Sequence, residues 1–127
     1  MKTKIIIDST TDLMPEFEER VSIVPLTVRF GDEEFIDGVT IDHKTFYEKL
    51  AEGKEFPSTS QATPHEFQKE YEKINNAGDE AVVITVSSKL SGTYQSAVIA
   101  AQEFENIYVV DSGTGSVGGG ILTELAL

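Results

Sequence analysis

The chain has 127 residues, with 10 Lys and Arg against 22 Asp and Glu, a formal net charge of −12 and no cysteine. That length predicts one ordinary domain that can bury a real core. So acidic a surface repels nucleic acid, and the absence of cysteine excludes disulfides, thiolate metal sites and thiol catalysis. The apolar runs are far shorter than the roughly 20 residues that span a bilayer. We therefore expect no integral membrane segment, no nucleic-acid partner and a cytoplasmic location.

Strand and helix signals alternate along the chain, which is typical of an α/β domain with a mostly parallel sheet. We expect four to five strands in one layered sheet flanked by helices. The runs that predict them are Lys4–Ile7, Ser22–Phe30, Glu33–Ile36, Ala81–Val86 and Ile107–Val110. Pro25 indicates an edge strand or a bulge. Ala81–Val86 is almost continuously apolar, which predicts a central strand covered on both faces.

Capping residues mark the predicted helices. Asp42 begins one that Gly53 ends, with Phe46, Tyr47 and Leu50 on one face. Thr63–Glu66 forms a capping box and opens a helix that ends near Asn76 and buries Phe67, Tyr71 and Ile74.

Two more helices are expected towards the end of the chain. One runs from Gly92 to Glu103, with Tyr94, Ala97, Val98 and Ala101 turned inward. After the glycine-rich segment Gly113–Gly120, Ile121–Leu127 begins the other.

Loops rich in hydroxyl and carboxylate groups follow three of the predicted strands: Asp8–Asp12, Ser87–Thr93 and Asp111–Ser116. In an open α/β sheet, ligands bind outside the carboxyl ends of the strands. These side chains therefore either line a ligand site or cap the helices that follow. Lys89 is the one cation among them, which suits a small anionic group or a neutral polar head held by helix N–H groups.

Signals for catalysis or for a cofactor are weak. Gly113, Gly115 and Gly118 match the spacing of the dinucleotide fingerprint, but they follow the last strand, not the first. We interpret them as glycines that allow close packing or a flexible loop. His43 and His65 fall in the first turns of predicted helices without metal-like spacing. We expect surface roles for both, with no metal, no cofactor and no catalytic residue.

Four segments in order resemble the DegV family, and the block Leu90–Ala97 is the most specific of them. The others are Asp8–Leu13, Thr59–Gln61 and Val110–Ser112 with the serine and glycines that follow it. The resemblance implies a non-catalytic carrier, which is the fatty-acid-binding subunit of bacterial fatty acid kinase. Such a carrier holds a long-chain fatty acid in an apolar tunnel between two lobes, and a separate kinase subunit phosphorylates its carboxylate for phospholipid synthesis.

The resemblance also assigns residues. Thr59 and Ser91 are expected to bind the fatty-acid carboxylate through their hydroxyls. Nearby supporting groups are expected from Ser60, Gly92, Thr93, Ser9 and Ser112. Thr59 lies in a stretch that we predict as a loop between two helices, kept extended by Pro57.

The resemblance covers the family's N-terminal lobe, residues 1–127, and we expect the second lobe, with the histidine that completes the carboxylate site, to be missing. Such a lobe is expected to expose an apolar face that favours self-association. Two further interpretations stay open. One is an α/β enzyme that binds a nucleotide or phosphometabolite at the Ser- and Gly-rich strand ends. The other is a half-protein that acts only as an interaction module.

Overall fold

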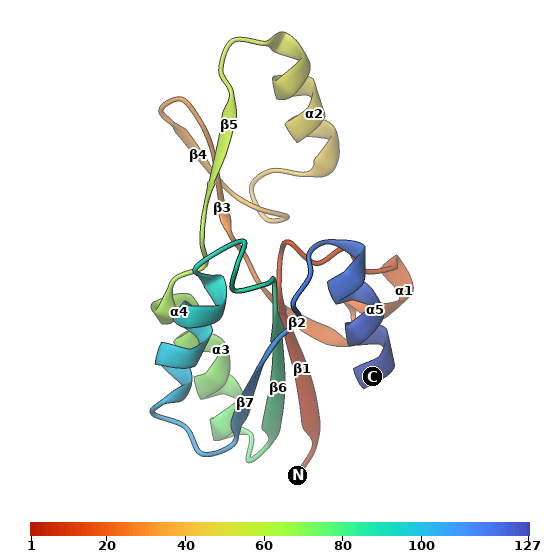
Figure 1. The fold of residues 1–127 in the computed structure, drawn as a ribbon, viewed down its shortest axis with the longest axis vertical. Coiled ribbons are helices and arrows are strands. Elements are labelled where there is room, and N and C mark those ends of the chain that lie inside the picture. The colour runs from red at the N-terminus through yellow and green to blue at the C-terminus, as the bar shows by residue number, and fades with distance from the viewer.

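The computed structural model describes all 127 residues. The chain forms two sheets, one above the other in Figure 1. The elements in chain order are β1 (Thr3–Asp8), α1 (Pro15–Glu18), β2 (Val21–Val24), β3 (Thr27–Phe30), β4 (Glu33–Ile36), α2 (His43–Glu52), β5 (Pro57–Ser60), α3 (Pro64–Asn76), β6 (Glu80–Thr85), α4 (Thr93–Ala101), β7 (Ile107–Asp111) and α5 (Val117–Ala126).

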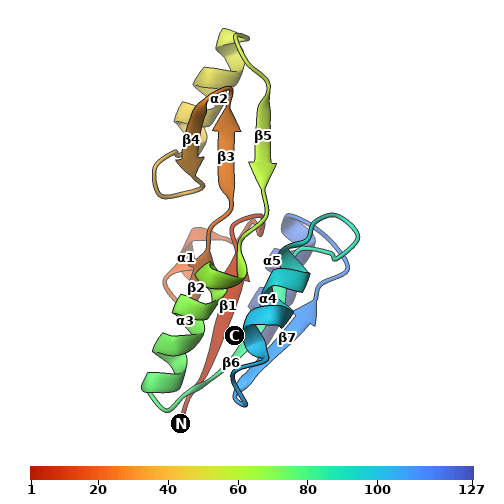
Figure 2. The ribbon, with the colours of Figure 1, turned by 90° about the vertical axis from the view of Figure 1, so that its left-hand side faces the viewer.

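The larger part, called here the parallel unit, is a four-stranded sheet in the order β2-β1-β6-β7 with every pair parallel. Helices α3 and α4 cover one face, and α1 and α5 lie on the other (Figures 1 and 2). The predicted α/β fold with a mostly parallel sheet is confirmed. Strand β6 lies between β1 and β7, as its apolar run predicted.

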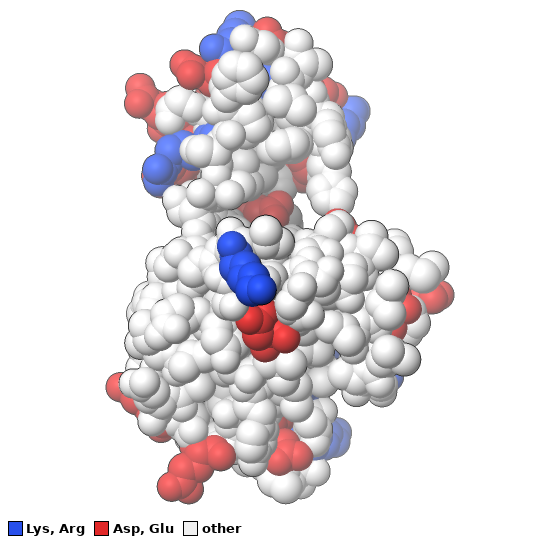
Figure 3. Space-filling model, in the orientation of Figure 1, with Lys and Arg blue, Asp and Glu red and all other residues white.

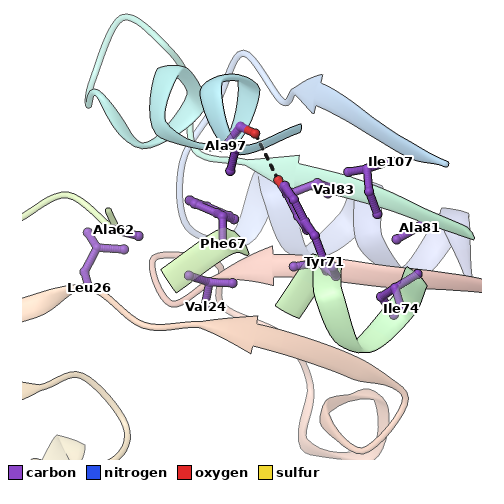
Figure 4. Packing of buried hydrophobic residues seen from close by; sticks show 12 residues of the cluster. Val24, Leu26, Ala62, Phe67, Tyr71, Ile74, Ala81, Val83, Ala97 and Ile107 are labelled. Atoms are coloured by element: carbon purple, nitrogen blue, oxygen red, sulfur yellow. Dashed lines mark hydrogen bonds between the residues drawn. The ribbon is translucent and has the colours of Figure 1, made fainter. Parts of the chain in front are cut away.

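The main core lies between this sheet and helices α3 and α4 (Figure 4). Helix α3 opens with the predicted capping box at Thr63 and buries Phe67, Tyr71 and Ile74, as expected from their spacing. The hydroxyl of Tyr71 donates a hydrogen bond to the carbonyl of Ala97 at 3.1 Å, which ties α3 to α4. Burial raises the pKa of this hydroxyl, so it remains a donor.

The expectation of a single sheet is wrong, because Ser22–Phe30 is not one strand. Its first half pairs with β1 in the parallel sheet, and its second half becomes β3 in a separate antiparallel sheet. The break falls at Pro25, which has no N–H to donate. The next N–H, of Leu26, donates to Ser9 Oγ at 2.9 Å instead of to a strand.

The second part, called here the antiparallel unit, contains β3, β4, β5 and α2, with its strands in the order β4-β3-β5. The predicted hairpin of Glu33–Ile36 with β3 is confirmed. Residues Pro57–Ser60, predicted as an extended loop, form edge strand β5 on the other side of β3. The proline fits because the first residue of an edge strand need not donate to a partner.

Helix α2 covers one face of the antiparallel sheet. Its predicted ends are confirmed, since Asp42 accepts from Thr45 N at 2.7 Å and Gly53 closes the helix with a φ of +66°. The hydrogen bonds from Thr45 hold the pKa of Asp42 below its usual range. Only part of the predicted buried face is covered, because Phe46 is half-buried while Tyr47 stays 64% exposed.

Helix α4 is shorter than predicted and ends at Ala101. Ala97 is buried as expected, whereas Tyr94, Val98 and Ala101 are half-buried. The more deeply covered face also includes Thr93 and Ser96, which are polar and were therefore not assigned to the core.

Helix α5 begins earlier than predicted, at Val117, so part of the glycine-rich segment is helical. Gly119 and Gly120 are buried against the loop that follows β1. A Cβ atom on Gly120 would lie 2.0 Å from the carbonyl oxygen of Asp12. Of the three glycines interpreted as close-packing or loop residues, Gly118 packs tightly, since a Cβ there would lie 2.3 Å from Thr114 Oγ1, while Gly113 has open space around it.

We predict that Gly120→Ala lowers the free energy of unfolding by about 2–3 kcal/mol, because a backbone carbonyl has to move to make room. Gly119→Ala is the matched control. Its Cβ would meet the flexible Thr11 side chain at 3.3 Å, and alanine favours the helix. Urea unfolding of both variants checks this, and equal losses would contradict it.

Candidate functional site

The carboxyl ends of β1, β6 and β7 point towards the antiparallel unit (Figure 1). The three predicted polar loops follow these ends, so the sheet gathers them at one edge. This is the edge of a parallel sheet at which ligands bind in α/β folds.

Asp8, the last residue of β1, holds two of these loops in place. Its carboxylate is fully buried. One oxygen accepts from the N–H of Val86 at 2.7 Å, and the other accepts from the N–H of Thr10 at 2.9 Å and from the Thr10 hydroxyl. Because the carboxylate binds donors on either side, the start of the β1 loop and the end of β6 are fixed to each other.

The remaining loops are tied together in the same way. Ser87 N donates to Thr114 O at 2.8 Å, which joins the β6 and β7 loops. Ser116, whose φ is +55°, donates from its hydroxyl to Asp12 and so joins the β7 loop to the β1 loop. None of α1, α4 and α5 has a side-chain cap on its N-cap residue. Ser91, one residue before the N-cap of α4, accepts from the N–H of Thr93, so capping holds there, whereas the other polar groups of these loops mostly connect one loop to the next.

Two of the predicted supporting serines have structural partners. Ser9 Oγ accepts from Leu26 N at 2.9 Å and thereby fixes the chain where it crosses to the antiparallel unit. Ser112 Oγ donates to Thr114 O at 3.1 Å and accepts from Thr114 N, both within its own loop.

Thr59 lines a cavity of about 290 Å³ between the two units. Thr59 pairs with Val28, so its side chain lies on the α2 side of the antiparallel sheet. Ser9 lines the same cavity from below, and His43 borders it from the first turn of α2. His43 and His65 are both exposed first-turn residues, as predicted.

Ser91, Gly92 and Thr93 form a second group at the N-terminus of α4, outside that cavity. The hydroxyls of Ser91 and Thr93 lie 3.0 Å apart, and Ser91 Oγ also accepts from the N–H of Thr93. The N–H of Ser96 is the first in the helix to reach a backbone carbonyl, that of Gly92. The N–H of Thr93 is taken by Ser91 Oγ, whereas the amides of Tyr94 and Gln95 have no acceptor within the chain and are open to another one, as at any helix N-terminus.

Gln61 connects these two groups, although the sequence analysis quoted it only as part of a motif. It follows Ser60 at the end of β5, and its side-chain Nε2 donates to Ser96 Oγ at 3.2 Å. Its amide lies directly over Gly92, where a Cβ atom would be 2.0 Å from Oε1. The segment that carries Thr59 and Ser60 is therefore in contact with the segment that carries Ser91.

The surface around these loops carries little positive charge. In the view of Figure 3 the parallel unit presents a largely uncharged face below the hollow that separates the two units, with acidic atoms inside that hollow. Asp111 accepts from Ser88 N at 3.2 Å and Gly113 N at 2.9 Å. Hydrogen bonds from the side chain of Ser88 and from Gly113 lower the pKa of Asp111, with a smaller contribution from Lys89. An anion would rely on N–H groups and hydroxyls here.

Other features of the structure lie apart from the motifs. A larger cavity, of about 550 Å³, lies between α3 and the end of β2 and contains none of the predicted site residues. No group of three or more His, Asp or Glu side chains is arranged to hold a metal ion. None of the helices is both long and apolar enough to cross a bilayer.

Comparison with known proteins shows the family of this chain. The sequence model of the DegV family, described as a family of uncharacterised proteins, matches residues 2–126. The chain belongs to the DegV family. A DegV domain-containing protein of Clostridium perfringens is 38% identical over 125 residues, which cover 95% of this chain and 45% of that protein. A protein of Thermotoga maritima named as a fatty acid-binding protein is 39% identical over 118 residues, 88% of this chain and 41% of that protein.

Solved DegV structures share the fold. A fatty acid-binding DegV protein from Thermus thermophilus superposes with a TM-score of 0.89 at 36% identity, over 99% of this chain and 46% of that one. A stearic acid-binding protein from Eubacterium ventriosum gives a TM-score of 0.88 at 31% identity, over 98% of this chain and 45% of that one. The chain thus spans less than half the length of these relatives.

We predict that Asp8→Asn lowers the free energy of unfolding by about 2–3 kcal/mol, because an amide group cannot accept from donors on both of its sides. Asp32→Asn is the control, since Asp32 lies exposed in the β3–β4 turn and should change stability by less than about 0.5 kcal/mol. Denaturant unfolding compares the two variants. Equal stability of Asp8→Asn and the wild type would show that the carboxylate does not hold the loops.

The Asp111 carboxyl provides a pH-dependent test. Because its pKa is lowered by folding, it stabilises the protein above its unfolded pKa, and this stabilisation is lost as the pH falls through the folded pKa. We predict that Ser88→Ala raises the Asp111 pKa towards its usual range and reduces that loss on acidification. Carboxyl chemical shifts followed through an acid titration measure the pKa directly. An unchanged pKa in the variant would contradict the assignment of Ser88 as the main cause.

Proposed function

We propose that this chain binds a long-chain fatty acid and holds its carboxylate between the end of β5 and the N-terminus of α4. One observation carries the proposal: the Thr59–Gln61 segment is in contact with the start of α4, in a chain whose relatives include named fatty acid-binding proteins. The carboxylate would be bound by the hydroxyls of Thr59 and Ser91. Ser60, Gly92 and Thr93 would add nearby groups, with Ser9 and Ser112 shaping the surrounding loops.

The chemistry of this region suits one carboxylate. The hydroxyl of Ser91, which is only half-buried, can turn to donate, with the buried Thr93 hydroxyl 3.0 Å behind it, and the open amides at the start of α4 add the positive end of the helix dipole. Hydrogen bonds to a charged acceptor contribute about 1.5–3 kcal/mol each. A few such bonds orient the headgroup without the cluster of cations that a polyphosphate would need.

Apolar side chains lead away from this region and would contact the acyl tail. Leu90, next to Ser91, is 70% exposed and packs beside Gly115, close to the start of α5. On α5 itself, Val117 and Ile121 are more than half exposed. Each buried methylene contributes about 0.8 kcal/mol, so most of the affinity would come from the tail.

The wider assignment follows the family resemblance. The chain would be the N-terminal lobe of a cytoplasmic, non-catalytic carrier, with the fatty acid as its bound molecule and no other cofactor. A separate kinase subunit would phosphorylate the carboxylate. Because the second lobe would supply the rest of the tunnel, the chain by itself would bind more weakly than a full-length relative and could self-associate through the exposed apolar face.

A nucleotide-binding role has less support from the geometry. Gly120 lies against the backbone of the β1 loop, and Gly118 against the side chain of Thr114. Of these two, Gly118 belongs to the fingerprint spacing, and its packing leaves no room for the close approach of a pyrophosphate that such glycines allow.

Extraction of the purified chain with organic solvent, followed by mass spectrometry, tests the proposed function directly. We expect a co-purifying long-chain fatty acid, together with a rise in melting temperature on adding palmitate or oleate. Recovery of no lipid, with stabilisation by NAD, ATP or a sugar phosphate instead, would overturn the proposal. An oligomer that responds to none of these compounds would favour an interaction module.

We predict that Thr59→Ala and Ser91→Ala each weaken fatty-acid binding by about tenfold to a hundredfold, since each removes one hydrogen bond to a charged group. Ser58→Ala is the matched control, because Ser58 neighbours Thr59 on β5 but its side chain lies on the opposite face of the sheet. Competition with a fluorescent fatty acid measures all three affinities. A loss in the control equal to that in Thr59→Ala would point to disruption of β5 rather than to a lost headgroup contact.

A further inference from the structure

We infer that Gln61 is a positioning residue, which sets the placement of the Thr59–Ser60 segment relative to the N-terminus of α4. The inference rests on the proposed function, since its consequence is measured as affinity for a fatty acid. It assigns Gln61 no direct contact with the ligand.

The two units are joined in a way that makes such a residue necessary. The chain crosses between them twice, once from β2 to β3 and once from β5 to α3. The extensive contacts between helices and strands all lie within one unit or the other. Thr59 belongs to the antiparallel unit and Ser91 to the parallel unit, so the geometry between them depends on the crossings.

In each crossing one residue is buried in the main core of the parallel unit: Leu26 in the first crossing and Ala62 in the second. The first crossing has an additional hydrogen bond from Leu26 N to Ser9 Oγ. At the second crossing, the corresponding side-chain bond is the one from Gln61 Nε2 to Ser96 Oγ. Ser96 is 2% exposed and lies on the inner face of α4, so Gln61 is bound to a fixed point.

Gly92 shows that the Gln61 amide occupies a defined place. Any Cβ atom at position 92 would lie 2.0 Å from Oε1 and 2.7 Å from Cδ of Gln61. A side chain at position 92 would therefore displace the Gln61 amide from its place beside the backbone of Gly92. The contact places the end of β5 directly beside the open amides of the helix.

The contact is also poorly suited to a purely structural role. Gln61 is exposed and belongs to none of the apolar clusters. Its loss should therefore change overall stability little, while it frees the β5 end to move with respect to Ser91. Variants of Gln61 should therefore lose affinity for the fatty acid while their stability stays close to that of the wild type.

The test compares Gln61→Ala with Ser96→Ala and the double variant in the 127-residue chain. We expect each single change to weaken palmitate binding by about fivefold to tenfold, with the melting temperature nearly unchanged. Both changes break the same hydrogen bond. The palmitate affinity of the double variant should therefore equal that of whichever single variant binds palmitate less tightly. Gln68→Ala is the matched control, since its Nε2 makes a comparable bond to Glu103 at 2.9 Å, away from the site.

Backbone amide shifts of the ligand-free variants separate this inference from the proposed function. Gln61→Ala should shift resonances in both Ser58–Ser60 and Gly92–Tyr94, whether or not the chain binds lipid. If the wild type binds no fatty acid, the proposed function fails, and the shifts alone decide whether Gln61 couples the two segments. Shifts confined to one segment, wild-type affinity in Gln61→Ala, or additive losses in the double variant would overturn the inference.

Discussion

The buried carboxylate of Asp8 is the constraint on which the geometry of the site depends. A charged group without water is stable only when donors surround it, and here those donors come from Thr10 and from Val86 at the end of a neighbouring strand. The loops after β1 and β6 are therefore held in register. Further bonds from Ser87 and Ser116 extend this network to the loop after β7. The three loops at this edge of the sheet are therefore joined through their own polar groups.

Most polar side chains of these loops bind other groups of the protein. A run of Ser, Thr and Asp at a strand end suggests either a binding site or helix caps, and most of these side chains serve neither purpose. Ser9 and Ser112, for example, bind backbone groups of Leu26 and Thr114. The hydroxyls of Ser91 and Thr93 differ from these, because they lie against each other and Ser91 also binds the first amide of α4.

The division into two units explains why the proposed carboxylate site draws on distant segments. One part of it stands on a rigid parallel sheet, and the other on an antiparallel sheet connected through two crossings. Placing the hydroxyl of Thr59 on the second unit makes the site depend on how the units are oriented. A single side chain, Gln61, contacts both the end of β5 and the start of α4. Exposed apolar side chains, among them Leu90, Val117 and Ile121, lie near the same region.

Features that arise from local chemistry could be predicted from the order of the amino acids. Asp42 and Thr63 began helices because their side chains cap nearby amides, and Ala81–Val86 was identified as a central strand by its apolar run. The family was also recognisable, since its motifs are contiguous. Other features depend on contacts between distant segments. Pro57–Ser60 is a strand because β3 lies beside it, and Ser22–Phe30 is divided at Pro25, after which Leu26 N donates to Ser9. Gln61 and Gly92 are 31 positions apart, so their contact exists only once the two units are folded together.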